Sequence, residues 1–226
     1  LLATATLGNI PLFAAPVSTG DFESEHAYRL PFEGQWVTTA GGGDVATNYH
    51  ATSPFFRWAY DFTRVVDGER HSGDGNKLEQ YYCYGEPVLA PVSGKVVAAE
   101  SEQQDHVPGE REEQSSEPPG PDQQRLIPLG NFVVIKVDTD EYLFAGHMRQ
   151  GSVTVEAGDE VERGEKIGEC GNSGRTVQPH IHVHLQNSKK FPGVTVQGFV
   201  AAEGLPMRFS NYLADGEKIE IGWRTG

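Results

Sequence analysis

The chain has few cysteines, few basic residues and no long apolar run, and each shortage excludes a class of protein. Its two cysteines, Cys83 and Cys170, lack the C-x-x-C spacing of a thiolate metal site. Eighteen lysines and arginines stand against 32 aspartates and glutamates, and the resulting net charge of −14 argues against binding nucleic acid or an anionic membrane through a basic face. The mildly apolar residues 1–16 are too few to span a bilayer. We therefore expect no nucleic-acid partner and no membrane-spanning segment.

The cysteines leave one question open. Cys83 and Cys170 could form a disulfide in an exported protein, or both could be free and buried. The sequence does not choose between these states.

Regular helical patterns are also scarce. The chain consists mainly of short β-branched or aromatic runs separated by turn residues, with 27 glycines and 14 prolines overall. Clear examples are the run 88–99, interrupted at Ser93-Gly94, and the hairpin 132–145, which turns at 138–140. We expect an all-β fold, an antiparallel β-sandwich or open barrel, with a functional groove across one sheet.

Three histidines, His180, His182 and His184, alternate with aliphatic residues in the segment 179–186. In a strand, successive side chains point to opposite faces, so the histidines should line one face while the aliphatic residues enter the core. A row of imidazoles indicates metal chemistry, although a half-buried strand with a histidine-rich polar face is the simpler alternative. Because His184 lies about 7 Å from His182 along the strand, we expect it to support the site or the fold.

Two other segments contain the ligand types that zinc prefers. Residues 142–148 read as a strand that includes His147 near its end, and His50 precedes a short segment with one carboxylate, Asp61. His26 and His106 lack metal-like spacing and should be surface residues, and His71, in a segment rich in glycine and aspartate, should also be solvated. Four aromatic residues near this region could line a groove but are more often core: Tyr49, Phe56, Trp58 and Tyr60.

The order of these segments resembles that of the lysostaphin-like (LytM-type) zinc metalloendopeptidases, which cut peptide bonds in the bacterial cell wall. The resemblance spans residues 31–212, through the His50/Asp61 region, 85–97, 130–135, the His147 strand, 161–168 and 179–182. It implies that His50, Asp61 and His182 bind one Zn²⁺ ion and that His147 and His180 are catalytic histidines. It also implies an extracytoplasmic location, in the cell envelope, the periplasm or the medium, and peptidoglycan peptide as the substrate.

One position departs from the family pattern. In the compact family motif, the first histidine lies four residues before the aspartate, and this chain has Arg57 there. A guanidinium cannot ligate a cation. His50 is therefore the expected ligand, as in the longer loop of some family members, and His71 is a distant second choice. Two imidazoles and one carboxylate leave the open position that a hydrolytic zinc centre needs for water.

We divide the chain into an N-terminal arm or edge strand (1–30), a metallopeptidase domain (31–212) and a C-terminal extension (213–226). Within the domain, residues 100–129 are polar and rich in turn residues, so we expect a long mobile loop. This loop is either a solvated insertion or a flap on the rim of the groove.

Three functions are consistent with the sequence. The leading hypothesis is a zinc endopeptidase that hydrolyses peptide cross-links or stems of peptidoglycan. The second is a catalytically inactive envelope module that binds wall peptide or activates another hydrolase. The third is a zinc-storing or structural domain, which would need a fourth protein ligand such as His184. The bond that is cut, the roles of His147 and His180 as acid and base, and the oligomeric state stay open.

Overall fold

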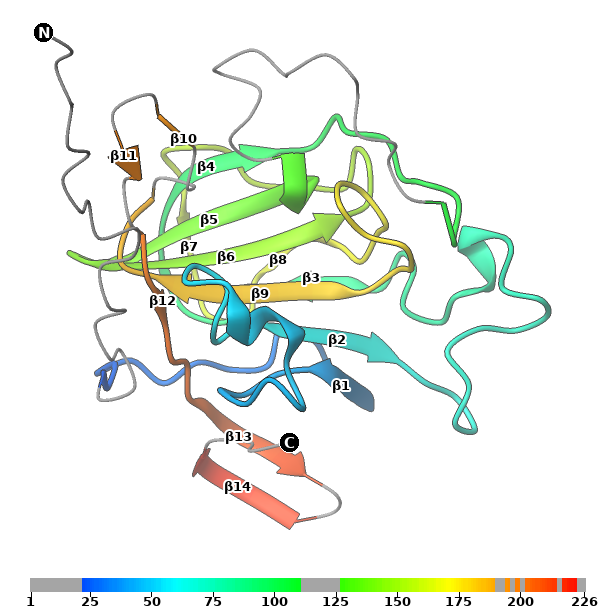
Figure 1. The fold of residues 1–226 in the computed structure, drawn as a ribbon, viewed down its shortest axis with the longest axis horizontal. Coiled ribbons are helices and arrows are strands. Elements are labelled where there is room, and N and C mark those ends of the chain that lie inside the picture. Colours follow the sequence, from blue (N-terminus) through cyan, green and yellow to red (C-terminus); the bar gives the residue numbers. More distant parts are fainter. Residues whose placement is uncertain are drawn as a thin grey trace, which may run out of the picture.

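The structure, a computed structural model, is built almost entirely of β-strands (Figure 1). It describes residues 22–110, 127–189, 194–195, 198–199, 202–214 and 217–222. In these ranges the helices are three short 3₁₀ turns, η2 (Tyr49–Thr52), η3 (Leu78–Gln80) and η4 (Ile127–Leu129). The prediction of an all-β fold is confirmed.

One antiparallel sheet dominates the molecule. Its strands lie in the order β1-β2-β9-β6-β5-β4-β7, with β12 paired to β9, and the sheet stays open. The bounds are β1 (Trp36–Ala40), β2 (Tyr60–Arg64), β4 (Gly94–Glu100), β5 (Asn131–Asp138), β6 (Glu141–Met148), β7 (Glu160–Val161), β9 (Ile181–Gln186) and β12 (Gly204–Leu205). Three two-stranded ribbons complete the fold: β3 (Pro87–Leu89) with β8 (Lys166–Glu169), β10 (Val194–Thr195) with β11 (Gly198–Phe199), and β13 (Phe209–Ala214) with β14 (Glu217–Gly222).

The main core covers one face of the large sheet and contains the aliphatic residues of β9. Ile181, Val183 and Leu185 are fully buried there, together with Val88 of β3 and Ile167 of β8. The β3–β8 ribbon therefore packs across the sheet as a second layer, as expected for a sandwich. The predicted hairpin at 132–145 corresponds to β5 and β6, and the interrupted run 88–99 corresponds to β3 and β4.

The opposite face of β9 carries the histidines, as the alternation predicted. The register pairs Asp61 of β2 directly with His182, and it pairs His182 with Gly146 of β6 on the other side. A carboxylate, an imidazole and the residue next to His147 are thus aligned across three adjacent strands. This alignment depends on pairing between segments that are far apart in the sequence.

Parts of the flanking segments are well packed. Tyr28 is buried in the main core, forms a bridge with Phe209 and donates a hydrogen bond from Oη to Glu141 Oε2 at 2.7 Å. Residues 1–21 of the expected arm lie outside the described residues, as do 215–216 and 223–226 of the expected extension.

The expected loop at 100–129 is described over 100–110 and 127–129. Residues 105–109 lie against the segment 172–177. Asp105 Oδ1 accepts a hydrogen bond from the backbone nitrogen of Asn172 at 2.6 Å, and the backbone nitrogen of Gly109 donates to the Val177 carbonyl at 2.8 Å. Residues 111–126 lie outside the described part of the chain.

Cys83 and Cys170 are both free and buried. The Cys83 thiol donates to the Pro179 carbonyl at 3.1 Å, just before the histidine strand. Among the described residues, no helix has the length and apolar character needed to cross a membrane.

Candidate metal centre

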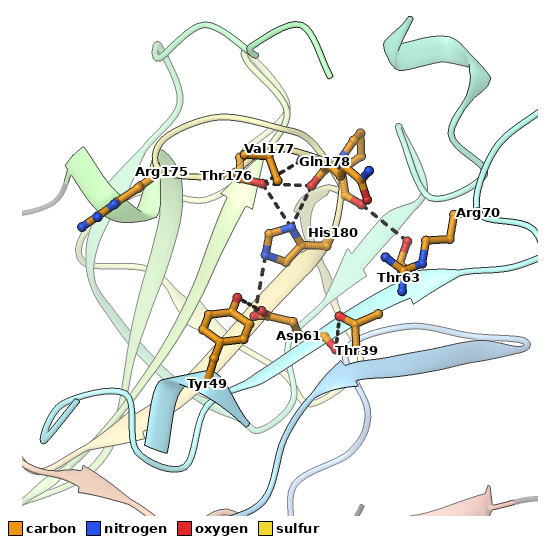
Figure 2. Close-up of a pocket in the computed structure, with 11 residues that line it drawn as sticks. Thr39, Tyr49, Asp61, Thr63, Arg70, Arg175, Thr176, Val177, Gln178 and His180 are labelled. Atoms are coloured by element: carbon orange, nitrogen blue, oxygen red, sulfur yellow. Dashed lines mark hydrogen bonds and ion pairs between the residues drawn. The ribbon is translucent and has the colours of Figure 1, made fainter. Parts of the chain in front are cut away.

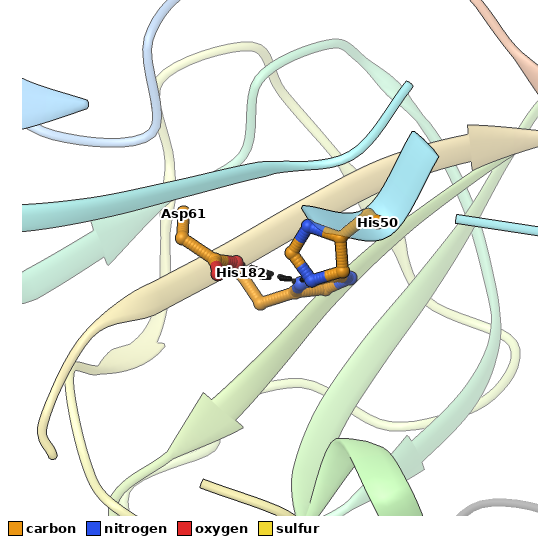
Figure 3. Close-up of side chains that lie close together, drawn as sticks. All are labelled: His50, Asp61 and His182. Carbon is orange, nitrogen blue, oxygen red and sulfur yellow. Dashed lines mark hydrogen bonds and ion pairs between the residues drawn. The ribbon is translucent and has the colours of Figure 1, made fainter. Parts of the chain in front are cut away.

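Three side chains from separate segments converge on one point: His50 from η2, Asp61 from β2 and His182 from β9 (Figure 3). Each offers one ligand atom, and these atoms all lie within 4.8 Å of one another. The His50 side chain is 10% exposed, and those of Asp61 and His182 are each 3% exposed. The structure thus brings together the three residues that the sequence analysis selected as metal ligands.

Asn48 fixes the orientation of the His50 ring. Its side-chain amide nitrogen donates to three backbone carbonyls, those of Gly42, Arg57 and Ala59. The amide oxygen must therefore face η2, where it caps the turn and lies 3.0 Å from His50 Nδ1. His50 Nδ1 donates to this oxygen, which leaves Nε2 as an acceptor, 3.7 Å from Asp61 Oδ2.

A buried chain of hydrogen bonds fixes His182 in the same way. Gln186 donates from Nε2 to the Ser188 carbonyl, so its Oε1 accepts from His184 Nε2 at 3.3 Å. His184 Nδ1 is then an acceptor for His182 Nε2 at 3.0 Å. The remaining nitrogen, His182 Nδ1, presents its lone pair to Asp61 Oδ1 at 2.9 Å. Burial holds the pKa of His184 well below its usual value, so the His184 ring, which connects Gln186 to His182, is neutral.

The centre therefore consists of acceptors that face one another. Burial lowers the pKa of His50 to about 4, so its ring is neutral at pH 7. Burial by itself would raise the pKa of Asp61, but the neighbouring His180 and the contact with His182 lower it overall, so the carboxylate is ionised. Two imidazole nitrogens and one carboxylate around a small space suit a divalent cation, and this donor set is typical of zinc.

His184 does not take the place of a fourth ligand. Both of its ring nitrogens are hydrogen-bonded within the chain, and the ring stacks on Phe144 with centroids 4.7 Å apart. In this position His184 contacts the His182 ring, and neither of its nitrogens is directed to the three-residue centre.

His147 and His180 lie beside the three converging side chains. His147 Nδ1 donates to the Ser173 carbonyl at 2.8 Å, and His180 Nδ1 donates to the Gln178 carbonyl at 2.8 Å. The two rings are 4.6 Å apart, and His180 Nε2 lies 3.6 Å from Asp61 Oδ1. Both rings therefore keep a free Nε2 lone pair. Burial lowers the pKa of His147 well below its usual value.

The backbone of His147 is strained. Its φ angle is +62°, a left-handed conformation that few non-glycine residues adopt. Such strain is often found at functional sites, where the surrounding structure enforces it. Here the neighbouring Gly171 amide donates to the His147 carbonyl at 3.0 Å and holds this corner of the sheet in place.

The other candidate residues lie elsewhere. His71 packs against Tyr81, with ring centroids 5.1 Å apart, and does not join the three-residue centre. The Arg57 carbonyl accepts a hydrogen bond from Asn48, but this arginine supplies no ligand atom. His26 lies 3.5 Å from Asp138, and His106 is partly exposed, both outside the centre.

Tyr49 departs from the expectation that these aromatic residues belong to the core. It is 65% exposed, and its hydroxyl donates a short hydrogen bond to Asp61 Oδ2. Tyr60 is in the core, while Phe56 packs edge-on against the rings of His182 and His184. The hydrophobicity of a tyrosine does not show whether it is buried or exposed, so the sequence does not distinguish Tyr49 from Tyr60.

Two supporting residues, Asn48 and Gln186, were not identified from the sequence, although each has a signal. Asn48 precedes a short turn in the position of a cap. Gln186 continues the two-residue alternation of the histidine strand by one more step, which places it on the same face.

A groove of about 660 Å³ opens over the centre (Figure 2). Asp61, Tyr49 and His180 line it, together with Thr39, Thr63, Arg70 and the segment 175–179. The groove gives a bound molecule access to the carboxylate, the phenol and one of the two histidines that flank the proposed ligands.

Comparisons with known proteins identify a family for the chain. Residues 76–192, just over half of the chain, match the model of Peptidase family M23. The match includes His147, His180 and His182, whereas His50 and Asp61 precede it. No curated protein matches the chain.

Three solved structures illustrate the similarity. A zinc-containing peptidase from Vibrio cholerae is 19% identical, with 71% of this chain and 36% of that one covered and a TM-score of 0.40. A catalytic-domain mutant of the prophage-encoded M23 protein EnpA from Enterococcus faecalis is 19% identical, with coverage of 76% and 98% and a TM-score of 0.43. Lysostaphin from Staphylococcus simulans is 22% identical, with coverage of 57% and 37% and a TM-score of 0.33. The chain thus spans little more than a third of the Vibrio peptidase and of lysostaphin.

Proposed function

The chain belongs to peptidase family M23, and from this premise we propose that it is a zinc-dependent endopeptidase that hydrolyses peptide bonds of peptidoglycan. The observation that carries the proposal is the convergence of three acceptor atoms, from His50, Asp61 and His182, beneath a groove. In this proposal the protein works outside the cytoplasm on wall peptide.

His50 Nε2, His182 Nδ1 and a carboxylate oxygen of Asp61 would hold the ion. When bound, zinc supplies a Lewis acid that activates water and polarises the scissile carbonyl. Asn48 and the His184–Gln186 pair keep the two imidazole lone pairs directed inward, because their hydrogen bonds fix which ring nitrogen carries the proton.

The two remaining histidines would move protons. His147 is buried and neutral, so its Nε2 can act only as an acceptor, the role of a general base. His180 lines the groove, where it can exchange a proton with the substrate and deliver one to the leaving amine. Their rings are close enough, at 4.6 Å, to act on one reacting centre.

Tyr49 would stabilise the oxyanion that develops during attack. Burial of its hydroxyl and the neighbouring Asp61 raise the pKa of Tyr49, so it stays a neutral donor. Because the ring is exposed at the groove, the hydroxyl can turn from the carboxylate to a substrate oxygen.

We expect Tyr49→Phe to lower kcat about 100-fold, the effect of losing one oxyanion donor, while the zinc content stays the same. Turnover of peptidoglycan and bound metal are measured on the same sample. Tyr142→Phe on β6 is the control, since that hydroxyl lies near Thr139 and away from the groove. Loss of zinc in Tyr49→Phe would instead assign the hydroxyl to holding Asp61.

The proposal as a whole is tested by elemental analysis of the purified protein and by wall digestion before and after chelation. We expect about one zinc ion per chain. Release of new amino termini from peptidoglycan should stop on chelation and return with added zinc. Absence of zinc would refute the metal assignment.

The second candidate is an inactive envelope module that binds wall peptide or activates another hydrolase. The observation in its favour is the departure from the compact family motif, with Arg57 in place of a histidine. Stoichiometric zinc without cleavage of several types of wall would favour this candidate over the peptidase.

A further inference from the structure

We propose that Arg70 and Arg175 make the groove select one class of peptide. These peptides carry a free carboxylate close to the part of the peptide that lies over the metal centre. The inference rests on the proposed peptidase function and names its class of substrate. It starts from two arginines that line the groove and have no carboxylate partner among the described residues.

Half of the eight arginines in the described residues have such a partner. Four of those described form ion pairs: Arg29 with Glu33, Arg64 with Glu86, Arg149 with Glu169 and Arg208 with Glu23. Arg70 and Arg175 are exposed, and within the part of the chain that the structure describes neither has a carboxylate oxygen within 4.0 Å. In a protein with 32 acidic residues, two guanidinium groups at one groove that are unpaired within the described residues concentrate positive charge there.

The two arginines lie on opposite sides of His180 (Figure 2). Between them the other lining side chains are uncharged, apart from the centre itself: Thr39, Tyr49, Thr63, Thr176, Val177, Gln178 and Pro179. Asp61 is the one carboxylate among the lining residues, and the proposed ion would use it as a ligand. No acidic side chain of the lining is therefore free to neutralise either arginine.

The charges decide what the groove attracts. With two guanidinium groups, one carboxylate and a divalent ion, the groove would carry a net positive charge in a chain whose net charge is −14. Clefts with a charge opposite to their surroundings concentrate the field and steer oppositely charged ligands toward them. An acidic peptide is thus repelled by most of the surface and attracted at the groove.

The guanidinium group also sets the geometry of recognition. Its planar fork donates two parallel hydrogen bonds to the two oxygens of a carboxylate, whereas an amide of the same size is uncharged and has only one accepting oxygen. Discrimination should therefore be strong between a carboxylate and its amide. The carboxylate can belong to a side chain or to the C-terminus, and these sources are separated by experiment.

The experiment uses the zinc-loaded protein and a fluorescein-labelled tetrapeptide with one glutamate, in four forms: both carboxylates free, side chain amidated, C-terminus amidated, and both amidated. Binding is followed by fluorescence anisotropy. We expect the free acid to bind about tenfold more tightly than the doubly amidated peptide at low salt, with a smaller ratio at high salt. The singly amidated peptides identify which carboxylate is recognised.

Arg70→Gln and Arg175→Gln should each reduce this preference severalfold and leave binding of the doubly amidated peptide unchanged. Lys95→Gln is the matched control, because it removes one positive charge from an exposed site on β4 that does not line the groove. Equal zinc content in all variants shows that the centre is intact. Equal binding of acid and amide by the unmodified protein, or a preference that survives both arginine substitutions, would overturn the inference.

Failure of the inference and failure of the proposed function are distinguishable. Arginine-dependent selection without cleavage of any wall would refute hydrolysis and leave carboxylate recognition standing. Zinc-dependent wall cleavage with no preference between acid and amide would refute the recognition and leave the peptidase.

Discussion

His50→Ala should release zinc and abolish peptidoglycan cleavage, whereas His71→Ala should change neither. His50 supplies one of three converging ligand atoms, so its loss leaves two. The loss of zinc affinity should exceed the roughly 10–100-fold effect of substituting residues that only support a ligand. Bound zinc is measured by elemental analysis, and cleavage by the release of new amino termini.

His71→Ala is a matched control because it is the same substitution at the other histidine weighed for this role. That ring packs against Tyr81, outside the centre. If His50→Ala retained zinc and His71→Ala lost it, the ligand assignment would be wrong. If both variants retained zinc and activity, a residue outside His50, Asp61 and His182 would have to complete the centre.

His147→Gln should keep zinc and lose turnover. Glutamine is close to histidine in size and can still donate to the Ser173 carbonyl, but it cannot accept a proton from the attacking water. We expect kcat to fall about 10²–10⁴-fold, the usual contribution of a positioned general base. The measurement combines single-turnover kinetics, zinc content and binding of wall fragments.

His26→Gln serves as the control, since His26 lies near Asp138 and away from the groove. Wall binding that persists in His147→Gln would separate a catalytic defect from a binding defect. Loss of zinc in this variant would mean that His147 contacts the ion, and unchanged turnover would remove it from the proton path.

The strand that carries the histidines was the part most completely predicted from sequence. Alternation over 180–185 fixes which side chains share a face, and the structure buries Ile181, Val183 and Leu185 in the core while His182 faces Asp61. The choice of His50 came from the resemblance, because no local pattern links residue 50 to residue 182. The pairing of β2 with β9 places Asp61 beside His182, and η2 brings the His50 ring within 5.0 Å of the His182 ring, measured between centroids.

Other features depended on long-range contacts that local patterns do not encode. Tyr28 falls within the predicted N-terminal arm or edge strand, and its burial comes from packing in the main core and a bridge to Phe209, which no local pattern encodes. Tyr49 was expected in the core because aromatic residues usually are, but its turn places it at the groove. No local sequence pattern links Arg70 to Arg175, and only the groove gives them a common position.

The centre draws its ligand atoms from segments that are far apart along the chain, since Asp61 and His182 are 121 residues apart. An unfolded chain would not hold these atoms together, so an ion bound here would bind the native state alone. Folding and metal binding would then be thermodynamically linked: free zinc at 100 times its Kd would add about 2.7 kcal/mol to the free energy of unfolding. The stability of this fold would therefore depend on the free zinc concentration in its surroundings.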